Sequence, residues 1–191
     1  MQTLPNSPEK APVTYSDLCN PRFFSQLYDA HAKKIYRYAV LRLSSVEDAE
    51  DILATTFLKL WEYARRKSAE NGSNAATDVV SNISALIYRI ARNLIVDRYR
   101  GRRSAVSLEY LGENGFEIPT SEMSSVVKAE YSAVLSAMSE LSSDDRDFVV
   151  LRYVEGVSVQ EIAEIFEITE NNASVRLYRA IKKLRAVVNG K

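Results

Sequence analysis

The chain contains, at residues 158–185, the stretch SVQEIAEIFEITENNASVRLYRAIKKLR. Ser158, followed three residues later by Glu161, matches the capping-box pattern, which predicts the start of a short helix. Thr169 is the candidate N-cap of a second, longer helix, so the residues just before it form a tight turn. This order of short helix, turn and longer helix predicts a helix-turn-helix motif.

The second helix of this motif is predicted to have one apolar and one polar face. The apolar residues recur at three- and four-residue spacing and are Ala173, Leu177, Ile181, Leu184 and Val188. The polar face carries Asn172, Arg176, Arg179 and Lys183. A basic face of this kind is typical of a helix that enters the major groove of DNA. A plain helical hairpin with a solvated basic face remains the alternative on this segment alone.

The composition of the whole chain is that of an ordinary soluble protein. Its 191 residues, 46% hydrophobic and 26% charged, are enough for one domain or two small ones. No apolar run is long enough to span a bilayer, and the N-terminus lacks the apolar core of a signal peptide. We therefore expect no membrane insertion and a cytoplasmic location.

The residues that usually carry catalysis or bind metals are few. The sequence contains one cysteine, Cys19, and one histidine, His31. A single cysteine excludes an internal disulfide, and no Cys/His cluster has the spacing of zinc ligands. His31 lies in a helical pattern, and we expect it to be a surface or half-buried side chain. With no Gly-rich phosphate loop and no nucleophile–base set, we expect no metal, no cofactor and no enzyme.

Charge is distributed unevenly along the chain, although the net charge is zero. Residues 22–103 contain 15 Lys/Arg and nine Asp/Glu, and residues 174–191 contain six Lys/Arg and no acid. Between them, residues 104–126 contain four Glu and no basic residue. Two basic segments joined by an acidic one indicate a polyanion that is contacted at two places. Solvated helix faces remain the alternative for either segment taken alone.

The periodicity predicts an all-α protein of two parts. Residues 1–21 are polar and contain four prolines, so we expect a flexible N-terminal arm. Residues 22–103 have helical periodicity and are predicted to form the first domain. Residues 104–126 have weak periodicity and are predicted to be an interdomain linker. Residues 127–191 are predicted to form the second helical domain, which ends with the helix-turn-helix.

Two helices of the first predicted domain have unusual charge. One starts at the candidate cap Ser45 and has Glu47, Asp48, Glu50 and Asp51 in its first turns. Four acids exceed what helix capping requires, so a basic partner surface competes with simple stabilisation of the helix dipole. The other helix, predicted at about Asn82–Arg100, combines arginines with tyrosines and an asparagine. Guanidinium groups hold phosphates and aromatic rings stack on unpaired bases, so this helix indicates nucleic-acid binding, with core-edge tyrosines as the alternative.

Three ordered signatures resemble the extracytoplasmic-function (group IV) sigma factors of bacterial RNA polymerase, in the sigma-70 family. They are DAEDIL at 48–53 with FLKLW at 57–61, IYRIARNLIVDRYR at 87–100, and residues 141–185 with LRYVEGVS at 151–158. These segments are similar to the family's regions 2.2, 2.3–2.4 and 4. The resemblance implies a three- or four-helix region 2 bundle and a region 4 helix-turn-helix, joined by a flexible linker.

The resemblance also implies roles for individual residues. The acidic helix would dock on the clamp helices of the polymerase's largest subunit through Asp48, Glu50 and Asp51, with Phe57 and Trp61 holding the helix in place. The −10 promoter element would be held and melted by Arg89, Arg92, Asn93, Arg98 and Arg100. In some members the position of Asn93 contacts a flipped-out base. The −35 element would meet Asn172, Ser174, Val175, Arg176, Arg179 and Lys183. The implied partners are core RNA polymerase, promoter DNA and an anti-sigma factor.

The sequence departs from the family pattern at several places. Ala54-Thr55 replaces the usual Gln-Glu pair, Leu86 replaces a frequent Trp, and the loop at about residues 67–82 is longer than usual. Asn171–Ser174 replaces a commoner Gly-Thr-Val-Lys type of sequence, so base preference at both promoter elements stays open. We expect an alternative sigma factor. The main alternative is a stand-alone two-domain helix-turn-helix regulator, for which no dimerisation helix or effector pocket is evident.

Overall fold

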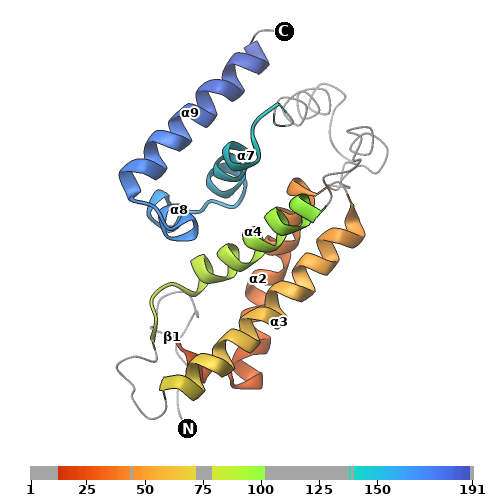
Figure 1. Cartoon of the computed structure of the whole chain (residues 1–191), viewed down its shortest axis with the longest axis vertical. Helices are drawn as coiled ribbons and strands as arrows, with labels where there is room; N and C mark the ends of the chain where they lie inside the picture. Colours follow the sequence, from red (N-terminus) through yellow and green to blue (C-terminus); the bar gives the residue numbers. More distant parts are fainter. Residues whose placement is uncertain (1–12, 44, 72–78, 102–137, 139, 190–191) are drawn as a thin grey trace. The chain divides into compact units, whose positions relative to one another are not determined.

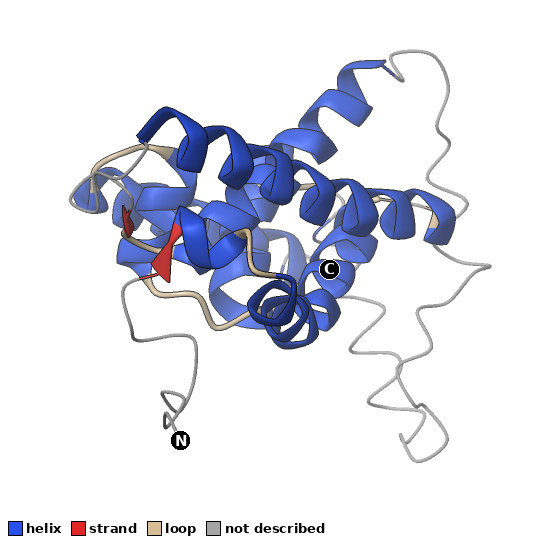
Figure 2. Cartoon of the chain, turned by 90° about the horizontal axis from the view of Figure 1, so that it is seen from below, coloured by secondary structure: helices blue, strands red, loops and turns tan. Residues whose placement is uncertain are grey.

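Two helical units make up the computed structural model, which describes residues 13–43, 45–71, 79–101, 138 and 140–189 (Figure 1). The units are Met1–Val106 and Ser107–Lys191. Most of the described residues lie in helices, and one pair of two-residue strands is present as well (Figure 2). The all-α prediction is confirmed, whereas the predicted linker, residues 104–126, lies outside the described residues. Within the described ranges, no helix has both the length and the apolar character needed to cross a membrane.

Three long helices form the body of the first unit: α2 (Pro21–Arg42), α3 (Val46–Asn71) and α4 (Ile83–Gly101). Each has a polar residue near its start whose side chain accepts a backbone N–H that has no partner within the helix. Asn20 Oδ1 accepts from the N–H of Arg22 (2.9 Å), Ser45 Oγ from that of Asp48 (3.1 Å) and Asn82 Oδ1 from that of Ala85 (3.0 Å). These local bonds explain why the helices start close to the predicted positions.

The three helices share one apolar core, in which α3 packs on both α2 and α4 (Figure 1). The residues with no exposed surface include Leu27, Ile35, Tyr38, Ala39, Ala49, Leu60, Ala64, Ile87, Ala91 and Ile95. Burying side chains of this size stabilises the unit by about 1.5–3 kcal/mol for each large aliphatic residue. The core therefore fixes how α3 and α4 lie against each other.

Two residues of this unit are buried more deeply than the sequence predicts. His31 is 1% exposed, so the expectation of a surface or half-buried side chain is wrong. It lies four residues from both Leu27 and Ile35, and this spacing places it on the buried stripe of α2. Tyr88 is also 1% exposed, and its ring meets that of Tyr38 at 5.7 Å with the planes 81° apart. Tyr88 is thus a core residue, and its ring is not accessible to an unpaired base.

The N-terminal segment, residues 13–20, is folded against the first unit. It consists of strand β1 (Val13–Thr14) and the short helix α1 (Tyr15–Leu18). Strand β1 pairs in antiparallel register with β2 (Val79–Val80), which leads into α4. Leu18 is fully buried, and α1 packs on α3 and α2. The prediction of a flexible arm is therefore wrong for residues 13–20, while residues 1–12 lie outside the described part.

The second unit contains α7 (Ser143–Val149), a five-residue π-helical turn η2 (Val150–Val154), α8 (Val159–Phe166) and α9 (Glu170–Asn189). The predicted capping box is present: Ser158 Oγ accepts from the N–H of Glu161 (3.1 Å), and the Glu161 carboxylate accepts from the N–H of Ser158 (2.9 Å). Thr169 Oγ1 accepts from the N–H of Asn172 at 3.3 Å, which confirms the second cap. Helices α8 and α9 are the predicted helix-turn-helix.

The core of the second unit is built on small residues of α9. Ala173 and Ala180 have no exposed surface, and Ile181 and Leu184 pack against the buried cluster around Ala180. Val188 was predicted on the same apolar stripe but is 42% exposed, so that prediction is wrong. It lies close to the C-terminal end of α9, at Asn189. In α7, the Phe148 ring stacks on Phe166 of α8 at 4.3 Å with an interplanar angle of 28°.

Candidate nucleic-acid and partner interfaces

The acidic start of α3 is only partly free to meet a partner. Glu50 and Asp51 are exposed, whereas the side chain of Asp48 is 9% exposed. Arg98, near the end of α4, reaches across to this group: its Nη1 lies 3.1 Å from Asp48 Oδ1 and its Nη2 lies 2.7 Å from Asp51 Oδ2. The structure thus brings a residue predicted to bind DNA onto two residues predicted to bind polymerase. Asp48 faces inward and can contribute to a partner surface only through the helix that it stabilises.

Phe57 and Trp61 attach α3 to α2 through edge-to-face and tilted contacts between aromatic rings. The Phe24 ring of α2 lies 4.9 Å from the Trp61 ring with the planes 80° apart, and the Tyr28 ring lies 4.7 Å from Phe57. Phe57 is 4% exposed and Trp61 is half-buried. Aromatic pairs at such angles favour one relative position, so these rings restrict how α3 lies on α2.

A pocket of about 550 Å³ lies between the C-terminal half of α3 and residues 86–97 of α4. Its lining combines cationic, acidic, amide, aromatic and aliphatic side chains. These are Lys59, Glu62, Tyr63, Arg66, Leu86, Arg89, Ile90, Asn93, Leu94 and Asp97. Of the residues predicted at the −10 element, Arg89 and Asn93 line this pocket, whereas Arg92, Arg98 and Arg100 do not. Its volume is in the range of sites that hold a small organic group.

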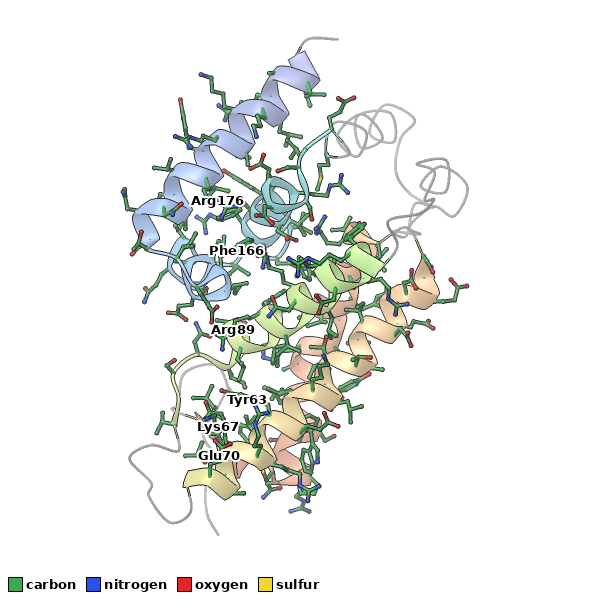
Figure 3. All side chains as sticks on the ribbon, in the orientation of Figure 1. Tyr63, Lys67, Glu70, Arg89, Phe166 and Arg176 are labelled. Atoms are coloured by element: carbon green, nitrogen blue, oxygen red, sulfur yellow. The ribbon has the colours of Figure 1, made fainter. Side chains whose placement is uncertain are left out.

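The α3 wall of the pocket carries a flat aromatic group and several charges. The guanidinium of Arg66 lies over the ring of Tyr63, 5.4 Å from its centroid. One turn after Tyr63 on α3, beyond the residues that line the pocket, Lys67 Nζ donates a hydrogen bond to Glu70 Oε2 at 2.9 Å (Figure 3). This bond raises the pKa of Lys67 and lowers that of Glu70. An aromatic ring beside cations and an amide is suited to an unpaired base, because the ring stacks on its face and the polar groups meet its edge and phosphate.

Sequence reasoning missed the α3 wall of this pocket. Lys59, Glu62, Tyr63 and Arg66 recur at three- and four-residue spacing, so they share one stripe of the helix. That stripe lies beside the apolar one, and its mixed charges do not distinguish it from an ordinary solvated helix face. The facing stripe of α4 was recognised only in part, through Arg89 and Asn93.

The remaining predicted residues of α4 have different surroundings. Arg92 is half-buried, and Arg100 is exposed and lies 3.7 Å from Asp97. The hydroxyl of Tyr99 donates a hydrogen bond to the carbonyl oxygen of Arg42, and the Arg42 guanidinium lies 5.7 Å from the Tyr99 ring centroid. Tyr99 therefore attaches the end of α4 to the end of α2, as expected for a core-edge tyrosine.

On α9, five of the six predicted residues are exposed: Asn172, Ser174, Val175, Arg179 and Lys183. Tyr178, which the sequence reading did not single out, is 69% exposed on the same helix. Lys183 donates to Asp145 Oδ2 of α7 at 2.5 Å while 60% of its side chain stays exposed. Burial alone raises the pKa of Asp145, but the hydrogen bonds from Lys183 and Ser142 and the charges of Lys183 and Arg176 lower it overall.

Arg176 faces outward only in part: 31% of its side chain is exposed and its guanidinium turns toward α7 and α8, so the prediction of a fully outward side chain is wrong. Its Nη2 donates to Asp144 Oδ2 at 2.8 Å, and its guanidinium lies 4.8 Å from the Phe148 ring centroid and 5.7 Å from that of Phe166 (Figure 3). The physical reason is its position between Ala173 and Ala180, both fully buried. These small residues let α9 lie close to α7, so the long arginine side chain lies across the phenylalanine rings.

Comparisons with known proteins agree with this architecture. The sequence matches the family descriptions "Sigma-70 region 2" over residues 27–105 and "Sigma-70, region 4" over residues 131–184. The ECF RNA polymerase sigma factor BldN of Streptomyces coelicolor is 29% identical over 165 residues, which cover 84% of this chain but only 58% of BldN. The ECF RNA polymerase sigma factor SigL of Mycobacterium tuberculosis is 27% identical over 161 residues, which cover 83% of this chain and 85% of SigL.

Two solved structures share the fold. CnrH, solved in complex with the cytosolic domain of CnrY, matches with a TM-score of 0.65 at 22% identity, covering 93% of this chain and 96% of CnrH. The sigma factor RpoE of Bartonella quintana, solved with the anti-sigma factor NepR, matches with a TM-score of 0.59 at 19% identity, covering 87% of this chain and 96% of RpoE.

Proposed function

This chain belongs to the sigma-70 family, in its extracytoplasmic-function (ECF) group, and from that premise we propose that it is an alternative sigma factor. It binds core RNA polymerase and directs promoter-specific transcription initiation, without a chemical step of its own. Residues 22–103 form the domain for polymerase and the −10 element, and residues 127–191 form the domain for the −35 element. A stand-alone regulator is not favoured, because the similarity to ECF sigma factors includes both domains in order.

Polymerase docks on the acidic start of α3. Glu50 and Asp51 offer exposed carboxylates to a basic partner surface, and Asp48 contributes from inside through its ion pair with Arg98. Phe57 and Trp61 keep α3 attached to α2, so the acids stay in one orientation. Charged groups held in this way add to the rate and specificity of association more than to its affinity.

The observation that carries the proposal for the −10 element is the pocket between α3 and α4, with Asn93 and Arg89 on one wall and Tyr63 on the other. One unpaired base of the element enters this pocket, where the tyrosine ring and the amide replace the stacking and pairing that the base loses. Extrusion of a base costs a few kcal/mol, and stacking on one aromatic ring returns about 1–3 kcal/mol. Arg92, Arg98 and Arg100 lie outside the pocket and contact the phosphates on either side.

The −35 element meets the exposed face of α9. Asn172, Ser174, Val175 and Arg179 are exposed there and reach base edges and phosphates of the major groove. Lys183 adds a phosphate contact while Asp145 holds its ammonium group. Arg176 acts on this face indirectly, because it fixes α9 against α7 and α8.

The first domain binds melted DNA and the second binds duplex DNA, and each contact strengthens the binding of the other. Once one domain has bound, the second binds at a raised effective concentration. Such a factor acts where transcription takes place, so the cytoplasm is its location. A partner of the anti-sigma class is expected as well, because RpoE was solved with the anti-sigma factor NepR.

Run-off transcription on a promoter library, with purified core polymerase and this protein, tests the proposal. We expect stimulation on a defined subset of promoters. On those promoters, Asn93→Ala lowers open-complex formation about tenfold, equivalent to about 1.4 kcal/mol. Gln26→Ala is the matched control, because it removes an exposed amide on α2 of the same unit. A protein that neither stimulates initiation on any promoter nor co-purifies with core polymerase is not a sigma factor.

A further inference from the structure

The folded N-terminal segment, residues 13–20, has no part in the functions assigned above. It is held in shape by its own contacts: Thr14 Oγ1 accepts from the N–H of Asp17 at 3.0 Å, and Asp17 Oδ2 accepts from the N–H of Thr14 at 2.9 Å. This reciprocal capping box starts α1 directly after β1. Val13 is 5% exposed and Leu18 has no exposed surface, so both ends of the segment are anchored in the unit.

The segment contacts the α3 wall of the pocket through one pair of rings. The rings of Tyr15 and Tyr63 lie 5.7 Å apart with their planes at 73°. Tyr63 lines the pocket, and the guanidinium of Arg66, another lining residue, lies over the same ring. The orientation of Tyr63 is therefore set from two directions, by Arg66 within α3 and by Tyr15 from the N-terminal segment.

The same segment also determines where the α4 wall begins. Val13 pairs with Val80 and Thr14 with Val79, so β1 holds β2 in register (the two red strands of Figure 2). Helix α4 starts at Ile83, three residues after Val80, and its first two turns carry Leu86, Arg89 and Ile90 into the pocket. Val80 is itself 6% exposed, so this end of the strand pair is packed and not a loose contact. One short segment thus contacts the α3 wall of the pocket and the strand that leads into its α4 wall.

We propose that residues 13–20 are a brace that positions the pocket for its unpaired base, with Tyr15 as a positioning residue that acts through Tyr63. This inference rests on the proposed role of the pocket in holding a base of the −10 element. A ring that stacks on a base must already lie in the right plane, because binding otherwise loses the free energy needed to order it. The Tyr15 ring restricts Tyr63 before DNA arrives, and the strand pair keeps the facing α4 residues at a fixed distance.

The test uses the full chain assembled with core polymerase and fluorescent single strands that carry the non-template −10 sequence of a promoter found by run-off transcription. A series of strands has one abasic site at each position. With the wild-type protein, one position should show a large loss of affinity when its base is removed, and that base is the one in the pocket. If no position shows such a loss, the pocket does not hold a base, and both the proposed role and this inference fail.

Given such a position, Tyr15→Ala should weaken binding of the intact strand about three- to tenfold and leave binding of the matching abasic strand unchanged. Tyr15→Phe keeps the ring and should stay within about twofold of wild type. Tyr15→Leu, which keeps apolar bulk without an aromatic ring, serves if the alanine variant does not fold and should also weaken the intact strand selectively. Affinity for core polymerase should not change in any variant.

Ile35→Ala is the control for stability alone, because Ile35 is a fully buried residue of α2 that neither lines the pocket nor belongs to the brace. At a temperature where both variants are folded, it should leave the affinity for intact and abasic strands at the wild-type values. The inference is overturned if Tyr15→Ala binds the intact strand as wild type does, if it weakens intact and abasic strands equally, or if Ile35→Ala reproduces its effect.

Discussion

Nη2 of Arg98 lies 2.7 Å from Oδ2 of Asp51, so the end of α4 is joined to the start of α3 by an ion pair. The same guanidinium lies 3.1 Å from Asp48, whose side chain is 9% exposed. Arg98 thus links the helix proposed to bind DNA to two acids of the helix proposed to dock on polymerase. A change at this point should affect both surfaces at once.

Removal of Arg98 should destabilise the first unit. In Arg98→Ala the Asp48 carboxylate stays nearly buried without this counterion, so we expect the free energy of unfolding to fall by about 1–3 kcal/mol. Urea unfolding followed by the fluorescence of Trp61, the single tryptophan of the chain, measures this unit alone. Asp51→Asn breaks only the exposed half of the pair and should leave stability nearly unchanged. Equal losses of unfolding free energy in the two variants would show that the ion pair with the nearly buried Asp48 contributes no more than the exposed pair with Asp51.

Arg176 and Arg179, three residues apart on α9, should separate into a structural and a DNA-binding role. Arg176→Ala removes an ion pair and the contacts with two phenylalanine rings, so the second unit should lose about 1–2 kcal/mol of stability. Hydrogen exchange in α7, α8 and α9 should become faster. Arg179→Ala should leave exchange unchanged and weaken use of promoters that depend on the −35 element. If Arg176→Ala keeps the wild-type rate of hydrogen exchange and loses only DNA binding, Arg176 is a DNA-binding residue and not a structural one.

The features that the sequence predicts well are those encoded by neighbouring residues. The capping box of Ser158 and Glu161, the cap at Thr169 and the start of α3 at Ser45 each depend on residues within one helical turn. Gly156, two residues after the π-helical turn, is also a local feature, because it adopts a φ of +71° that other residues rarely adopt.

The features that the sequence does not predict depend on distant residues. The pocket has one wall from α3 and one from α4; the α3 wall alone has no pattern that differs from a solvated helix face, and the α4 wall was recognised only through Arg89 and Asn93. The strand pair of the N-terminal segment has two residues on each side, too few for an alternating pattern. Arg176 was predicted to point fully outward, because helical spacing alone does not show that its guanidinium meets Asp144 and the rings of Phe148 and Phe166.

The substitution Glu167→Gly should stabilise the helix-turn-helix. Glu167 ends α8 with φ 55° and ψ 43°, the left-handed region in which a Cβ atom clashes with the backbone. Glu167→Gly removes this clash, and we expect the free energy of unfolding of the second unit to rise by about 0.5–1 kcal/mol. Glu164→Gly, in the middle of the same helix, is the control and should lower it by about 1 kcal/mol. Thermal unfolding by circular dichroism compares them, and a Glu167→Gly variant that melts at or below wild type contradicts the expectation.

Acid should loosen the second unit through Asp145. Burial alone raises the pKa of this carboxyl group, but hydrogen bonds from Lys183 and Ser142 and the charges of Lys183 and Arg176 lower it overall. Because the folded state holds the carboxylate more strongly than the unfolded state does, the unfolded state binds a proton at higher pH. The contribution of Asp145 is therefore fully present above the ordinary pKa of about 3.9 and is lost as the pH falls through the lowered value.

Asp145→Asn lacks this titrating group and should show two effects in melts of the full chain from neutral pH to about pH 3. Its second unit should be less stable than wild type at neutral pH, and its stability should fall less on acidification. Lys183→Met removes the lysine that pairs with Asp145. It should flatten the pH dependence of stability in the same way, because the Lys183 hydrogen bond and charge both lower the pKa of Asp145. If Asp145→Asn follows the wild-type curve at a constant offset, the acid sensitivity of the unit comes from other carboxylates.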